Sequence, residues 1–345
     1  MIHLYRSLVD TPLDFEARLS ALHHKLQIAI ELEHSTIPVY LYSLYSIREG
    51  CNVEIAALML SVIKQEMLHM SLDCNILNAI GGAPKIDDPN FIPHYPGPLP
   101  GGVESGLLVS LSPQSKQLVY DEFMVIESPE IPLDYDLSMA EGITIGQFYR
   151  HLQDEIVALN KENDIFTGKP ELQLETGFRE LQIAPVTDEE SALAAIDLIV
   201  AQGEGTSMSP MDPERELAHY YKFAEIYYGR ALVPNPDQAA ATATPWVFAG
   251  HPIAFDPAGV HPVISNPSQA SYGGQPRLLD LNLSFNRAYS GLLRKLHRVF
   301  NGRPDWLGPA LLEMQALKQQ AQLLMTQEVV PGLTAGPTFE YTPPN

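Results

Sequence analysis

Residues 54–77 read EIAALMLSVIKQEMLHMSLDCNIL, a run that has the composition of a buried helix but carries Glu66 and His69 within it. Both residues fall on the helical face that Val62 and Ile76 assign to the core. Burying a carboxylate or an imidazole without a partner costs several kcal/mol. The run therefore predicts that another part of the chain, or a bound ion, compensates these two side chains.

The composition predicts a globular protein and excludes some partners. The chain has 345 residues, of which 45% are hydrophobic, enough to bury a full core in one large domain or two ordinary ones. Its formal net charge of -21 argues against binding to nucleic acid or to an anionic membrane, since both would repel it. With only Cys51 and Cys74, no basic or apolar leader and no run of eighteen apolar residues, we expect a cytoplasmic protein.

A helical hairpin is predicted on either side of the turn at residues 48–52. Apolar residues recur at steps of three and four over about 15–47 and again over about 53–80, which is the period of amphipathic helices. Pro38 lies inside the first helix, where it removes a backbone hydrogen bond and predicts a kink. Two long helices joined by a tight turn are antiparallel neighbours.

The rest of the chain alternates between helical and Pro/Gly-rich segments. Residues 82–140 are expected to form an ordered excursion over one end of a bundle, with a short helix near 113–125. Further helical patterns cover residues 144–163, 190–204, 212–229, 278–300 and 306–326. Residues 230–275 lack periodicity and are expected to form a long loop. These features predict a mainly α protein, with a bundle in 1–229 and a connection plus C-terminal helical region in 230–345.

The Glu-x-x-His motif occurs twice, at Glu66/His69 and at Glu216/His219. In a helix, residues three apart point about 60° from each other, so each motif aims a carboxylate and an imidazole at the same small volume. If the first hairpin turns near residue 50, the residue level with Glu66 is near position 34. Glu33 lies there and shares the phase of the core residues of its helix.

The same construction applies to the second motif. With a turn near Pro210, the residue level with Glu216 lies near position 204, where Glu204 extends the apolar stripe of Ile196 and Val200. Each hairpin would thus offer one Glu opposite one Glu-x-x-His. This is the ligand set of a carboxylate-bridged two-metal centre in a four-helix bundle. The predicted metal ligands are Glu33, Glu66, His69, Glu204, Glu216 and His219, with Glu66 and Glu216 bridging the two metals.

Two metal ions would neutralise these buried charges, and mixed oxygen and imidazole ligation suits iron or manganese better than zinc. We expect iron. Tyrosines 40, 42, 220 and 221 flank the constellation and are interpreted mainly as packing residues.

Several segments resemble a known family in their order along the chain. They are ELEHSTIPVYLYSLYSI, IKQEMLHM, YPGPLPGG, FMVIESPE, TIGQFY, QGEGT, ELAHYYKF and GPTFEY, between about residues 20 and 341. Together they are similar to the ferritin-like family of iminophenyl-pyruvate dimer synthase. The resemblance implies a ferritin-like bundle and oxidative chemistry on amino-acid-derived imines.

One departure from the family pattern leaves the third carboxylate open. In the general ferritin-like pattern this Glu lies mid-helix about thirty residues before the second Glu-x-x-His, whereas Glu204 precedes Glu216 by only twelve. Glu155 is the competing candidate. We favour Glu204, because the hairpin construction puts it at the same height along the bundle as Glu216. No comparable argument places Glu155 beside Glu216.

The leading hypothesis is an oxidoreductase whose paired metals activate dioxygen or peroxide for a small, amino-acid-derived substrate in secondary metabolism. The alternatives are an iron-binding protein or ferroxidase and a metal-binding bundle without turnover. The sequence allows a homo-oligomer and leaves the substrate open.

Overall fold

The computed structural model describes residues 4–5, 14–102, 107–128, 142–143, 145–175, 183–204, 209–236 and 245–344. Its main helices are α1 (Phe15–Ser46), α2 (Val53–Ala79), α5 (Ile145–Glu162), α6 (Glu189–Glu204), α7 (His219–Tyr228), α8 (Pro276–Val299) and α9 (Leu307–Met325). Residues 103–106 and 129–140 of the expected excursion, and Thr144, where the expected helix over residues 144–163 begins, lie outside the described residues.

The long helices α1 and α2 form the antiparallel pair that the sequence predicts. The side chain of Asp14 caps α1 by accepting a hydrogen bond from the backbone N–H of Glu16. The helix then continues past Pro38 to Ser46. A turn that contains Gly50 and Asn52, both with positive φ, leads into α2.

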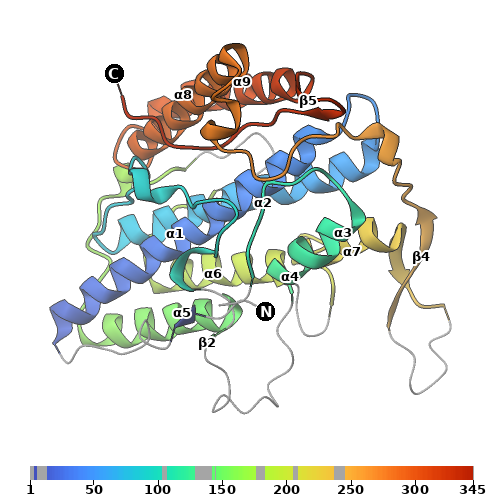
Figure 1. Ribbon diagram of the computed structural model, residues 1–345. Helices are drawn as coiled ribbons and strands as arrows, with labels where there is room; N and C mark the ends of the chain where they lie inside the picture. Colours follow the sequence, from blue (N-terminus) through green and yellow to red (C-terminus); the bar gives the residue numbers. More distant parts are fainter. Residues whose placement is uncertain are drawn as a thin grey trace.

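A second helical pair, α5 and α6, completes the bundle. The two helices pack on each other, α5 packs on α1 and α6 packs on α2 (Figure 1). The predicted mainly α four-helix bundle is confirmed. Its second hairpin differs from the expectation, because α5 takes the place that the sequence analysis assigned to residues 212–229.

Helix α7 is shorter than predicted. It was expected to begin near Asp212, but it begins at His219 and packs on α2 and α6. The residues before it form a turn, in which the N–H of Arg215 donates to the carbonyl of Asp212 at 3.0 Å and Arg215 has a φ of 67°. The helix therefore starts at the residue that ends the second Glu-x-x-His motif.

The excursion between α2 and α5 contains a short helical segment on the bundle surface. It comprises α3 (Lys116–Leu118), one π-helical turn (Val119–Phe123) and α4 (Met124–Ile126). Val119 and Phe123 are fully buried. The segment packs against α7, which brings its C-terminal end to the bundle.

The C-terminal region adds a hairpin and a helical layer. Where the sequence predicted a loop, β3 (Arg230–Pro234) and β4 (Trp246–Pro252) form an antiparallel hairpin. Figure 1 shows α8 and α9 on the face of the α1–α2 pair that lies away from α5 and α6. The other strands pair as β1 (Leu4–Tyr5) with β2 (Gly142–Ile143) and β5 (Glu328–Val330) with β6 (Leu333–Thr334). Short 3₁₀ turns cover Pro89–Phe91, Pro100–Gly102, Pro170–Leu172, Pro257–Gly259, Gln269–Tyr272 and Pro304–Trp306.

Helix α2 is long and apolar enough to cross a membrane by length and composition alone. However, 61% of its most apolar window is buried within the protein. Core helices of soluble proteins have the same character, and α2 occupies the core of this bundle.

Candidate metal centre

Buried carboxylates and imidazoles meet inside the bundle. Glu33 comes from α1, Glu66 and His69 come from α2, Glu127 follows α4 directly, and His219 begins α7. None of the five is more than 7% exposed. The chain therefore concentrates three carboxylates and two imidazoles where water has almost no access.

The five residues form two overlapping groups. One ligand atom from each of Glu33, Glu66 and His69 lies within 4.8 Å of the other two, and the same holds for Glu66, Glu127 and His219. The rings of His69 and His219 stack with centroids 5.3 Å apart. Glu66 belongs to both groups, so its carboxylate lies where a bridging ligand of two ions would lie.

The Nδ1 atom of His219 points at oxygens without making a hydrogen bond. It lies 2.8 Å from Oε1 of Glu66 and 3.4 Å from Oε2 of Glu127. Among the described residues it nevertheless has no hydrogen-bond partner, although it is buried. The nitrogen and the carboxylate oxygens are close but are not aligned for a hydrogen bond. This geometry is expected when the ligand atoms of a metal site point to a common centre rather than to each other.

Each histidine turns its other ring nitrogen to a glutamine. Nε2 of His69 lies 2.9 Å from Oε1 of Gln202, and Nε2 of His219 lies 3.2 Å from Oε1 of Gln65. An amide oxygen only accepts, so each Nε2 carries the hydrogen. Nδ1 of each ring then keeps its lone pair for the centre of the cluster.

The carboxylates respond differently to burial. Burial raises the pKa of Glu66 well above its ordinary value, and the charges of Glu127 and Glu33 raise this pKa further. Burial alone would also raise the pKa of Glu33, but the His69 ring, whose Nδ1 lies 3.3 Å from Oε2 of Glu33, and the hydrogen bond from the Tyr149 hydroxyl outweigh burial and lower the pKa of this group. Of Glu33 and Glu66, Glu66 is therefore the carboxylate whose charge the neighbouring groups stabilise less.

Hydroxyl groups orient the carboxylates from outside the cluster. The Tyr149 hydroxyl lies 2.6 Å from Oε1 of Glu33 and 2.9 Å from Oδ2 of Asp73, whose pKa is raised by burial. Tyr40 donates to Oε1 of Glu127 at 2.5 Å. The sequence analysis interpreted Tyr40 mainly as packing and did not single out Tyr149, which lies in the helix predicted over residues 144–163.

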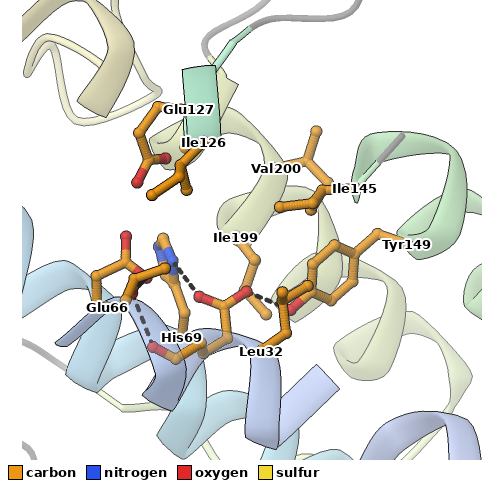
Figure 2. A pocket seen from close by; sticks show the side chains of 12 residues that line it. Leu32, Glu66, His69, Ile126, Glu127, Ile145, Tyr149, Ile199 and Val200 are labelled. Atoms are coloured by element: carbon orange, nitrogen blue, oxygen red, sulfur yellow. Dashed lines mark hydrogen bonds and ion pairs between the residues drawn. The ribbon is translucent and has the colours of Figure 1, made fainter. Parts of the chain in front are cut away.

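A small cavity opens beside the cluster. Its volume is about 40 Å³, more than the ~10–15 Å³ that one water-sized molecule needs. Figure 2 shows Glu127 reaching toward Glu66 and His69 from one side, while Tyr149 approaches from α5. The apolar part of the wall consists of Leu32, Ile126, Ile145, Ile199 and Val200. The cavity can therefore admit a small reactant next to the buried carboxylates and keep bulk water out.

The structure does not bring Glu216 to the cluster. Its side chain is 58% exposed, and its Oε2 lies 3.4 Å from Nζ of Lys222. The motif predicted that Glu216 and His219 share a helical face, but Glu216 precedes the first residue of α7. Its backbone N–H donates to Oδ1 of Asp212 at 2.8 Å, which holds it in the turn instead.

The two candidates for the third carboxylate are placed differently. Oε1 of Glu155 accepts a hydrogen bond from Lys25 at 2.5 Å, and Glu155 lies six residues, about 9 Å, further along α5 than Tyr149. Glu204 is the last residue of α6, and its side chain is not among those described. Its neighbour Gly203 lines the cavity, and a Cβ atom there would lie 3.9 Å from Oε2 of Glu127.

Glu127 is the cluster residue that the sequence analysis missed. The short helix was predicted to end near Val125, two residues before it. A detectable signal existed, since Val119, Phe123 and Glu127 recur at steps of four and are all buried. A buried Glu in phase with apolar residues is the same anomaly that points to Glu66.

These residues fit divalent cations. Carboxylate oxygens and imidazole nitrogens are ligands of first-row metals such as iron and manganese. Two dications would offset three carboxylate charges and would use the unpartnered Nδ1 of His219. The described cluster can therefore hold metal, and its candidate ligand groups are Glu33, Glu66 and His69, and Glu66, Glu127 and His219.

Comparisons with known proteins agree with this architecture. The sequence model of a family described as ferritin-like matches residues 26–228, more than half of the chain. Dichlorochromopyrrolate synthase of Lentzea aerocolonigenes is 26% identical in an alignment of 325 residues that covers 82% of this chain. The chain spans 29% of the length of that relative. A crystal structure of a ferritin-like protein from Caulobacter vibrioides superposes with a TM-score of 0.61 at 23% identity, and the match covers 93% of this chain and 97% of the other.

Proposed function

The chain belongs to the ferritin-like family, and on that premise we propose that it is an oxidoreductase with two metal ions in the buried cluster. The observation that carries the proposal is the pair of ligand groups that share Glu66. Iron is the favoured metal and manganese the alternative, because the donors are oxygen and imidazole. When bound, the metals would supply activation of dioxygen or peroxide.

The protein's own residues position the metal ligands and exclude water from the site. The apolar wall of the cavity keeps water from the reactants. Glu33 is held by the Tyr149 hydroxyl and Glu127 by the Tyr40 hydroxyl. These contacts restrict the carboxylates to few rotamers, which reduces the ordering needed when metal binds.

The proposed substrate is a small, amino-acid-derived compound of the imine type, oxidised or coupled in secondary metabolism. Two resemblances support this class: the motifs shared with the iminophenyl-pyruvate dimer synthase family, and the similarity to a relative named as a synthase. The cavity of about 40 Å³ suits dioxygen or peroxide, so a larger substrate would bind at its mouth. Since Cys51 and Cys74 are both free thiols, we also propose a reducing, cytoplasmic setting.

The test is reconstitution of the full chain with ferrous iron under anaerobic conditions. We expect roughly two iron ions per chain by elemental analysis, given two ligand groups. Oxygen consumption with an imine generated by an amino-acid oxidase would then support an enzyme, while oxidation of excess ferrous iron alone would support a ferroxidase. No bound metal after reconstitution, and none on titration, would refute the proposal.

A further inference from the structure

A line of polar groups connects His219 to the protein surface. Gln65 on α2 and Lys222 on α7 are both buried, with exposures of 3% and 4%. Nζ of Lys222 donates to Oε1 of Gln65 at 2.6 Å, and the same oxygen lies 3.2 Å from Nε2 of His219. Oε2 of the exposed Glu216 also lies 3.4 Å from Nζ of Lys222.

The chemistry of these groups determines how Gln65 must be oriented. A lysine ammonium has three donors and no acceptor, so Gln65 has to present its oxygen rather than its NH₂ group to Lys222. That oxygen also faces Nε2 of His219. A neutral imidazole has one N–H, and here it must be at Nε2, which leaves the lone pair on Nδ1.

We propose that Gln65 and Lys222 are positioning residues, which hold His219 in the tautomer that can bind metal through Nδ1. The inference rests on the proposed metal centre, and it concerns two residues that would act on the metal only through His219: Gln65 contacts the ring, and Lys222 holds Gln65. It also gives Glu216 a role other than ligand, as the surface partner of Lys222. In metal sites such outer partners typically change affinity by about 10- to 100-fold.

The opposing interpretation is that Gln65 merely satisfies a buried lysine. That interpretation predicts a loss of stability on substitution, with no change in the histidine. His69 provides an internal reference, because its Nε2 faces Gln202 at 2.9 Å rather than Gln65. A change confined to His219 would therefore separate the two interpretations.

The first experiment is NMR of the metal-free full chain labelled with ¹⁵N-histidine. We expect the signature of the Nε2–H tautomer for both His69 and His219 in the wild type. Gln65→Met removes the acceptor and should convert His219 to a mixture of tautomers while His69 stays unchanged. Gln65→Glu keeps an acceptor at the same place and should keep the wild-type tautomer.

The second experiment is titration with cobalt(II), a divalent probe that can be followed by its absorption. Gln65→Met and Lys222→Met should each lower the affinity of one of the two sites by about 10- to 100-fold, and Gln65→Glu should restore it. Lys25→Met is the matched control, because Lys25 is also a buried lysine but pairs with Glu155 away from the cluster. The Lys25→Met variant should bind cobalt with the affinity of the wild type.

Wild-type affinity and an unchanged His219 tautomer in both Gln65→Met and Lys222→Met would overturn the inference. If Gln65→Met does not fold, Gln65→Asn shortens the side chain by one carbon and should show the same loss of affinity. A wild type that binds no metal would refute the proposed function instead. The tautomers of the metal-free protein would still decide whether Gln65 orients His219.

Discussion

Replacing Glu127 by Gln tests the composition of the metal centre, because it removes one charge and keeps the size of the side chain. The amide oxygen can still accept the hydrogen bond that Tyr40 donates at 2.5 Å. Even outer-shell substitutions cost about 10- to 100-fold in metal affinity, so loss of a direct ligand should cost more than about 100-fold. This corresponds to more than about 2.8 kcal/mol at the site formed with Glu66 and His219.

The same substitution should have the opposite effect on the metal-free protein. The charge of Glu127 is one of the causes that raise the pKa of Glu66. Removing it takes a charge out of the buried cluster, so the free energy of unfolding should rise, by on the order of 1 kcal/mol. Weaker metal binding together with a more stable metal-free protein is a combination that general damage to the fold would not produce.

Glu216→Gln is the matched control for this prediction. Its side chain is 58% exposed, and exposed ion pairs contribute about 0–1 kcal/mol, so metal affinity should change less than about fivefold. Anaerobic titration with ferrous iron against a competing chelator measures affinity, and urea unfolding of the metal-free variants measures stability. Equal affinity losses in the two variants, or a larger loss in Glu216→Gln, would refute the assignment of Glu127 to the centre.

Three further predictions follow from burial and charge. Because burial raises the pKa of Glu66 above its ordinary 4.5, the folded metal-free protein retains a proton that the unfolded chain releases. Its free energy of unfolding should therefore decrease as pH rises above about 4.5, and Glu66→Gln should weaken this dependence in urea unfolding at several pH values. Metal removal should lower stability by about 2.7 kcal/mol per site when the free metal is 100 times its Kd, measured by thermal unfolding with and without chelator. Phe339→Ala should cost about 3–5 kcal/mol, since this 1% exposed ring packs edge-on against Phe285 and Tyr289, whereas the 49% exposed Val330→Ala should cost less than about 0.5 kcal/mol.

The first hairpin was predictable because its sequence is locally consistent. The helical period, the tight turn and the antiparallel packing together place Glu33 at the same height along the hairpin as Glu66. The structure brings these two side chains and His69 together. The lengths of both helices and their core faces were read from the same period. That these residues bind metal stays a prediction, but their meeting required only helix geometry.

The second hairpin was misjudged because a local turn displaced the helix. The N–H of Asp212 donates to the carbonyl of Glu216 at 2.8 Å, and Oδ1 of Asp212 accepts from the N–H of Glu216. Pro213 lies in the first turn of the helix predicted over residues 212–229, yet Pro is equally suited to a turn outside a helix. Glu216 and His219 therefore do not share a helical face, and the carboxylates that lie beside His219 in the structure are those of Glu66 and Glu127.

The cluster residues differ in the elements that hold them, and this difference decides which of them a periodicity analysis can find. Glu33, Glu66 and His69 lie in the interior of helices of 32 and 27 residues, where helical phase determines the direction of every side chain. Glu127 follows a three-residue helix, and His219 is the first residue of a ten-residue helix. Glu127 continues the four-residue step of the buried Val119 and Phe123, but at helix ends the direction of a side chain also depends on the packing of the whole segment. Here that packing is of α4 against α7, and the step alone does not indicate this contact. The ligand group formed with Glu127 and His219 therefore depends on tertiary structure, and metal bound there would tie two short segments to the long helix α2 through Glu66.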